Sequence, residues 1–173
     1  LGKAGKTLLF VGAKAEAREA VKEAAQKLNA PYVTSRWIGG TLTNFPEIKK
    51  RLDRLADLSS KREKGELAMF TKLERLLIDR EIDELTRAFG GVRDLTKTPD
   101  ALFVVDPRRE HIAVAEAVKM KVPVIALAGS DCNIATLTQV IPGNDASIAS
   151  VTFIAREIAD AYAKGKESVP VAA

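Results

Sequence analysis

The stretch Ala101-Leu102-Phe103-Val104-Val105-Asp106 decides the fold of this chain. Its five consecutive apolar residues do not alternate with polar ones, which is typical of a strand buried on both faces of a parallel sheet. Asp106 ends the run, and loops at the carboxyl ends of parallel strands are the usual place for sites. We therefore expect an α/β protein with helices on both faces of a mainly parallel sheet.

Similar patterns stand on both sides of this strand and extend the prediction. Other apolar runs predict strands over 7–12, 31–34, 122–128 and 139–142, and helical spacing of small or apolar residues predicts helices over 13–28, 110–120 and 146–164. Asp145 is the expected N-cap of the last helix. These elements predict a three-layer α/β/α domain formed by residues 1–45 and 90–166, followed by a loose C-terminal tail over 167–173.

Residues 46–89 differ from the rest of the chain. Pro46 stands where a helix would begin, and Gly90-Gly91 ends the segment. The interruption from Ser59 to Gly65 divides it into two runs, which predicts an inserted antiparallel coiled-coil hairpin with its tip at that interruption. The apolar residues recur at spacings of mostly three and four: Ile48, Leu52, Leu55 and Leu58, then Leu67, Phe70, Leu73, Leu77 or Ile78, Ile82, Leu85 and Phe89.

Composition excludes several classes of protein. Of the 173 residues, 46% are hydrophobic and 29% are charged, as in ordinary soluble globular proteins. No apolar run approaches the roughly 20 residues that a membrane-spanning helix needs. The one cysteine, Cys132, excludes an internal disulfide and any cysteine-based metal cluster, and it fits a reducing compartment.

Positive charge is concentrated in the first part of the chain. Residues 1–45 carry seven Lys or Arg against three Glu, whereas residues 98–173 carry seven against nine acidic residues. Such an excess suggests an anionic partner such as nucleic acid, although solvated lysines are the plain alternative.

The segment Arg36-Trp37-Ile38-Gly39-Gly40-Thr41-Leu42-Thr43-Asn44-Phe45, which we call the signature loop, lies within this positive region. It contains the only tryptophan, and its guanidinium and indole planes suit contact with phosphate and base. The Gly-Gly pair allows close approach of a phosphate, and the Thr and Asn side chains add donors. The alternative is that Trp37 caps the edge of the core.

A catalytic constellation is not visible in the sequence. His111 is the only histidine and lacks a nucleophile or a metal-ligand spacing, so no metal and no cofactor are expected. Asp106 and Asp131 could still flank a cleft at the strand ends beside Gly12, which leaves an enzyme that binds a phosphate-bearing ligand as one alternative. A protein–protein module that works through the hairpin seam is another.

Three separated motifs carry a resemblance to a known family. They are the signature loop, the segment from Pro99 through Asp106 that continues to Val122-Pro123, and Ile141-Pro142-Gly143-Asn144-Asp145. In this order, and together with Leu9-Phe10-Val11-Gly12 and the hairpin, they resemble the bacterial-type second protein of the small ribosomal subunit over nearly the whole chain.

The resemblance implies a flavodoxin-like domain that is not an enzyme and has no small-molecule substrate or membrane partner. It implies binding to 16S-type rRNA in cytoplasmic ribosomes, with an organellar ribosome as the alternative. It also implies contacts with other small-subunit proteins and help in recruiting the large mRNA-binding first protein of that subunit. The leading rRNA-contact candidates are Arg36, Trp37, Gly39, Gly40, Thr41 and Asn44, followed by Lys49, Lys50, Arg51, Arg108, Arg109 and His111.

Overall fold

The computed structural model describes residues 1–168 and contains one five-stranded sheet. All four strand pairings are parallel, and the strand order is β2-β1-β3-β4-β5, as in flavodoxin-like folds. The predicted α/β architecture is therefore confirmed. The strands are β1 Leu8–Val11, β2 Tyr32–Val33, β3 Ala101–Val105, β4 Val124–Ala128 and β5 Gln139–Pro142.

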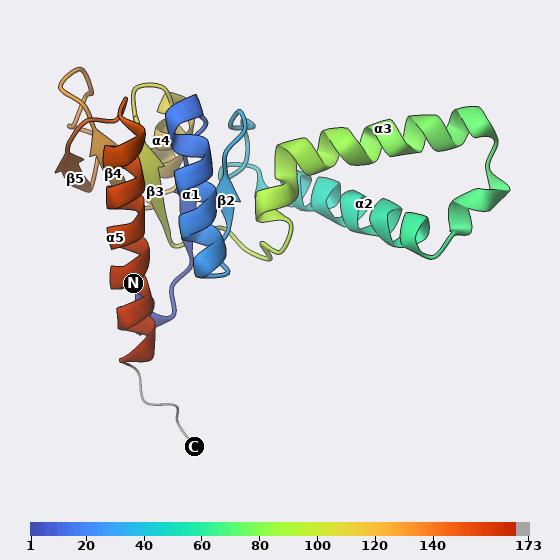
Figure 1. Cartoon of the computed structure of the whole chain (residues 1–173), viewed down its shortest axis with the longest axis horizontal. Helices are drawn as coiled ribbons and strands as arrows, with labels where there is room; N and C mark the ends of the chain where they lie inside the picture. The colour runs from blue at the N-terminus through green and yellow to red at the C-terminus, as the bar shows by residue number, and fades with distance from the viewer. Residues whose placement is uncertain (169–173) are drawn as a thin grey trace.

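Helices cover both faces of the sheet, and a pair of helices projects from one side of it (Figure 1). None of the helices within residues 1–168 has the length and apolar character needed to cross a membrane. The α-helices are α1 Ala15–Lys27, α2 Phe45–Glu63, α3 Lys72–Phe89, α4 His111–Lys119 and α5 Ile148–Glu167, and three short 3-10 helices are η1 Gly2–Ala4, η2 Glu66–Met69 and η3 Gly90–Val92.

One face of the sheet packs against α1 and α5. Side chains at alternate strand positions, including Leu8, Phe10 and Phe103, form this half of the core with the small residues of both helices. The rings of Phe10 and Phe103 meet edge to face with centroids 5.6 Å apart. A Cβ on Gly12 would lie 2.8 Å from a methyl group of Val21, so the glycine allows α1 to pack closely on the sheet.

The other face is covered by α4 together with the signature loop and the base of the hairpin. Trp37 and Leu42 pack with Leu9, Val11 and Val104 in this second half of the core. The signature loop therefore helps to cover this face of the sheet, in the same layer as α4, and is not only a surface connection.

The hairpin of α2 and α3 is held together by a short apolar seam. Leu55 and Leu58 from α2 pack against Ile82 from α3, and all three side chains are buried. The expected continuation of the seam toward the tip is only partly correct: Ile78 packs against this cluster and Leu67 is buried, but Leu73 is 66% exposed and Leu77 is 53% exposed. The two helices diverge toward their far ends (Figure 1), so these side chains lose their partner.

The tip of the hairpin lies later in the chain than the sequence indicates. Helix α2 continues through Ser59-Ser60 and ends at Glu63, and the chain reverses through Gly65, whose φ of +74° is left-handed. Thr71 and Glu74 then start α3 with a capping box, in which each side chain binds the other residue's backbone N–H. Serines are tolerated within a helix, so Ser59-Ser60 does not interrupt α2. The turn at Gly65 follows the end of α2, and the capping box sets the start of α3.

The start of α5 also differs from the prediction. Its N-cap residue is Ser147, and the side chain of Asn144 accepts hydrogen bonds from the N–H groups of Ala146 and Ser147. The expectation that Asp145 caps the helix is wrong, because its carboxylate turns toward Lys14. At the other end, α5 extends to Glu167, and the rest of the predicted tail, residues 169–173, lies outside the described residues.

Candidate nucleic-acid interface

The carboxylate of Glu116 lies at the centre of the signature loop. Glu116 is on α4 and is 9% exposed, and its side chain reaches from this helix into the loop. Its Oε1 accepts hydrogen bonds from Gly40 N at 2.7 Å and from Trp37 Nε1 at 3.3 Å. Its Oε2 accepts from Leu42 N at 2.9 Å, from Thr43 N at 3.1 Å and from Thr43 Oγ1 at 3.2 Å.

These donors keep Glu116 ionised inside the protein. Burial by itself raises the pKa of Glu116, but the hydrogen bonds from Gly40, Leu42, Thr43 and Trp37 outweigh it, so the net effect is a lowered pKa. Gly40 lets the loop turn around the carboxylate, since its φ of +94° is one that side-chain-bearing residues rarely adopt.

Two of the predicted rRNA contacts have buried side chains. Trp37 and Thr41 are each 4% exposed. The indole of Trp37 packs in the core and donates to Glu116, and Thr41 Oγ1 donates to Ile38 O at 2.6 Å. The alternative that Trp37 caps the core is confirmed, and stacking of its ring on a base is not available in this structure. The N–H of Gly40 likewise faces Glu116 and not the solvent.

The remaining candidates from this part of the chain are on the surface. Arg36, Gly39 and Asn44 are exposed on the outer side of the signature loop. Lys49, Lys50 and Arg51 are exposed in the first turns of α2, where Lys50 forms a surface ion pair with Glu47.

Residues that are far apart in sequence meet beside the signature loop. Arg36, Arg109 and His111 line one hollow of about 340 Å³, which we call the first hollow. Arg18 from α1 also lines it, although the sequence did not single this residue out. Arg108 does not join them, because its guanidinium binds the carboxylate of Asp131.

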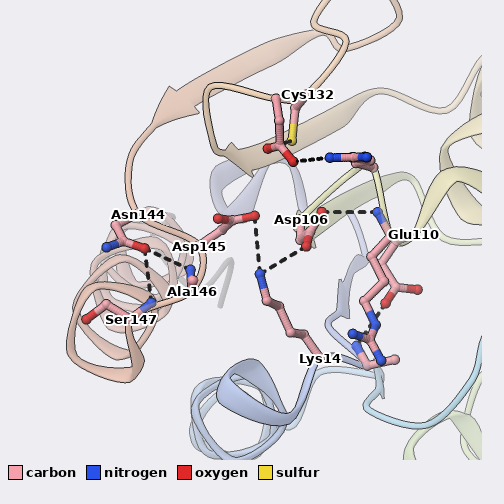
Figure 2. A network of polar contacts seen from close by, with 12 residues as sticks. Lys14, Asp106, Glu110, Cys132, Asn144, Asp145, Ala146 and Ser147 are labelled. Carbon is pink, nitrogen blue, oxygen red and sulfur yellow. Dashed lines mark hydrogen bonds and ion pairs between the residues drawn. The ribbon is translucent and has the colours of Figure 1, made fainter.

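A second polar cluster lies at the carboxyl ends of the strands, as Figure 2 shows. The ammonium of Lys14 stands between two carboxylates, 3.1 Å from Asp106 Oδ2 and 3.6 Å from Asp145 Oδ2. Burial lowers the pKa of Lys14, but the hydrogen bond and the charge of Asp106, together with Asp145, raise it overall. This cluster links the loops that follow β1, β3 and β5.

The same cluster contains the only group of possible metal ligands among residues 1–168. One ligand atom each from Asp106, Cys132 and Asp145 lies within 4.8 Å of the others. The ammonium of Lys14 already supplies the positive charge between the two carboxylates. Asp131 does not face Asp106 across a cleft as the enzyme alternative required, because it is engaged with Arg108.

Sequence reasoning missed the residue that organises the site. Glu116 shares the buried face of α4 with Ala113 and Ala117, so helical spacing places a carboxylate among apolar residues. An acidic residue on such a face needs buried donors. That signal could have identified Glu116, but not its partners, which lie more than 70 positions away.

These features define a class of protein: a flavodoxin-like α/β/α domain with an inserted helical hairpin and a loop fixed by a buried carboxylate. A model of one family, described as ribosomal protein S2, matches residues 1–165. The chain belongs to the ribosomal protein S2 family. The resemblance predicted from the three motifs is confirmed.

Individual relatives agree with this assignment. The chain is 45% identical to small ribosomal subunit protein uS2 of Leifsonia xyli over 161 residues, which are 93% of this chain and 54% of the relative. It is 46% identical to uS2 of Acidothermus cellulolyticus over 162 residues, with 93% and 59% covered. For uS2 of a Roseiflexus species, identity is 45% over 163 residues, with 94% and 62% covered.

The chain therefore spans between half and two thirds of the length of these relatives. Membership in a family of ribosomal structural proteins confirms the expectation that the chain is not an enzyme. The alternative of an enzyme that binds a phosphate-bearing ligand at the strand ends is wrong.

Proposed function

We propose that this chain is a structural component of the small ribosomal subunit of cytoplasmic ribosomes that binds small-subunit rRNA through the outer side of the signature loop. The observation that carries the proposal is the state of Arg36. Its side chain is exposed, and no carboxylate oxygen within residues 1–168 lies within 4.0 Å of it. A guanidinium left free in this way is suited to an RNA phosphate.

The surroundings of Arg36 support the same function. Asn44 is exposed on the outer side of the loop and offers an uncharged donor. Lys49 and Arg51 continue the positive surface onto α2. Since Glu116 fixes the loop backbone through Gly40, Leu42 and Thr43, the backbone that carries Arg36 and Asn44 is ordered before RNA arrives, which lowers the ordering cost of binding.

Reconstitution of small subunits from rRNA and purified proteins tests this proposal. Arg36→Glu reverses the charge at the loop without removing an internal contact, so we expect the variant to incorporate poorly at physiological salt while its thermal midpoint stays within about 2 °C of the parent's. Lys164→Glu is the charge control, because Lys164 is exposed on α5, which packs on the other face of the sheet, and has no carboxylate oxygen of residues 1–168 within 4.0 Å. Equal incorporation of both variants would show that the loop is not an rRNA contact.

We also propose that the assembled chain supports recruitment of the large mRNA-binding first protein of the subunit. This part rests on family resemblance alone. Subunits reconstituted with and without the chain should differ in how much of that first protein they retain after sedimentation. Equal retention would rule the role out and would leave rRNA binding untouched.

A further inference from the structure

A second hollow lies next to the first one. It has a volume of about 360 Å³ and lies between α1, the end of β2 and the base of the hairpin. Three of its lining residues, Lys22, Arg87 and Arg93, are basic, and none is acidic. Thr34, Ser35 and Thr86 add hydroxyl groups, and backbone is accessible at Gly90 and Gly91.

The two hollows are neighbours by two independent criteria. The first hollow is bordered by Arg36 and Trp37, and the second by Thr34 and Ser35, so both flank the segment Thr34–Trp37. On α1, Arg18 lines the first hollow and Lys22, one helical turn later, lines the second.

The arginines around these hollows have no acidic partner within residues 1–168, although Arg18 Nε donates a hydrogen bond to Ala13 O at 2.9 Å. Within the described part of the chain, no carboxylate oxygen lies within 4.0 Å of any of the five. Elsewhere four arginines are paired with acids, which shows that the fold can satisfy such side chains. The five are Arg18, Arg36 and Arg109 in the first hollow and Arg87 and Arg93 in the second.

Glu110 is the one acidic residue that lines either hollow. It is 4% exposed, and its Oε1 accepts a hydrogen bond from Ala13 N at 3.0 Å. Burial raises the pKa of Glu110 despite that hydrogen bond. Its carboxyl group is almost inaccessible and bound to Ala13 N, whereas three arginines line the same hollow, so the first hollow remains suited to an anion.

We propose that the two hollows bind phosphate groups of one RNA strand whose backbone crosses the segment Thr34–Trp37. This inference rests on the proposed function and adds Arg18, Lys22, Arg87 and Arg93 to the binding surface. Among the residues that line the hollows, only Ile112 is an exposed large hydrophobic side chain. A protein partner would need an apolar centre, whereas a sugar–phosphate backbone needs charge and hydroxyl donors.

Contacts of this kind position RNA without reading its sequence. Each arginine that neutralises a phosphate adds roughly one to the slope of log affinity against log salt. The affinity should therefore depend steeply on salt and little on the bases that cross the segment.

The test compares two double variants that lose the same charge. Arg93→Gln with Arg109→Gln removes one arginine from each hollow, and neither side chain makes a hydrogen bond within residues 1–168. Arg156→Gln with Lys119→Gln changes α5 and the last turn of α4 instead. Binding of small-subunit rRNA is measured at several salt concentrations, and thermal melting confirms that all proteins are folded.

We expect the salt slope of the hollow variant to fall by about two relative to the parent, and that of the control variant to stay near the parent value. Equal slopes for the two variants would overturn the inference and leave rRNA binding intact. If the parent chain itself fails to bind rRNA, the proposed function fails, and the inference fails with it.

Titration with inorganic phosphate at constant ionic strength separates two sources of the anion. If RNA occupies the hollows, millimolar phosphate should bind the parent weakly and compete with rRNA in the parent more than in the hollow variant. Tight phosphate binding that leaves rRNA affinity unchanged would assign the hollows to a free phosphate compound and would overturn the inference.

Discussion

The carboxylate of Glu116 accepts more hydrogen bonds than any other side chain within residues 1–168. It gives the loop around Gly40 and Leu42 a fixed conformation that hydrogen bonds within the loop alone do not provide. An ionised acceptor binds N–H groups about twice as strongly as a neutral one. These stronger hydrogen bonds offset the cost of burying the charge of Glu116.

Replacement of this carboxylate by an amide tests its role. Glu116→Gln keeps the size of the side chain, but one of its two acceptors becomes an NH₂ group that faces N–H donors. We expect the free energy of unfolding at neutral pH to fall by about 2–3 kcal/mol, measured by urea denaturation. Glu157→Gln, on an exposed position of α5, removes the same charge and should change it by less than about 0.5 kcal/mol.

The effect of Glu116→Gln should depend on pH. The folded protein holds the pKa of Glu116 below the unfolded value, which is about 4.3 for glutamate. The stabilisation is therefore present above that value and is lost as pH falls through the folded pKa. The difference in stability between parent and variant should begin to shrink below about pH 4.3, and a constant difference down to pH 3 would contradict ionisation of Glu116.

At the scale of elements, the hairpin is uneven along its length. Near the sheet, Leu55 and Ile82 are buried in the seam, whereas toward the tip Leu73 and Leu77 of α3 are exposed. The hairpin therefore gains its packing energy mainly along the part that reaches from the sheet to Leu58 and Ile78, whereas the exposed start of α3 depends on local signals such as the Thr71 capping box.

Two leucine truncations should separate these parts. Leu55→Ala removes a side chain that is 4% exposed and should lower the free energy of unfolding by about 2–4 kcal/mol. Leu73→Ala, at 66% exposure, should change it by no more than about 0.5 kcal/mol. Urea denaturation followed by far-UV circular dichroism measures both, and similar losses would show that Leu73 packs against something in solution.

At the scale of the whole molecule, Lys14 joins loops from three strand ends through Asp106 and Asp145. The side chains of the three residues are between 13% and 17% exposed, so the two carboxylates are poorly screened without the ammonium. This contact gives the carboxyl edge of the sheet a fixed geometry.

Lys14→Gln should therefore destabilise the chain by about 1.5–3 kcal/mol at pH 7. Lys27→Gln breaks the more exposed pair with Asp160 and should cost about 1 kcal/mol or less. Chemical denaturation at pH 7 measures both losses, and equal losses for the two variants would show that the partly buried contacts of Lys14 stabilise the chain no more than an exposed ion pair does.

Much of this architecture follows from local patterns. The uninterrupted apolar run at 101–105 predicted the central strand, and the spacing of Ile48, Leu52 and Leu55 predicted the first helix of the hairpin. Where two local signals competed, the prediction was wrong: Asp145 is a good N-cap residue, but an ion pair with Lys14 fixes its side chain elsewhere. The rRNA contacts remain predictions, now confined to side chains that reach the surface.

The sequence by itself determined the parallel sheet, the inserted hairpin and the family, because hydrophobic period and short motifs are properties of neighbouring residues. Only the tertiary structure decided which side of the signature loop faces outward. Trp37 meets its partner Glu116 across 79 positions, and Arg18, Arg36 and Arg93 meet at two hollows from separate elements. Such encounters depend on how helices pack on the sheet, and a loop rich in donors looks the same in sequence whether those donors bind RNA or a buried carboxylate.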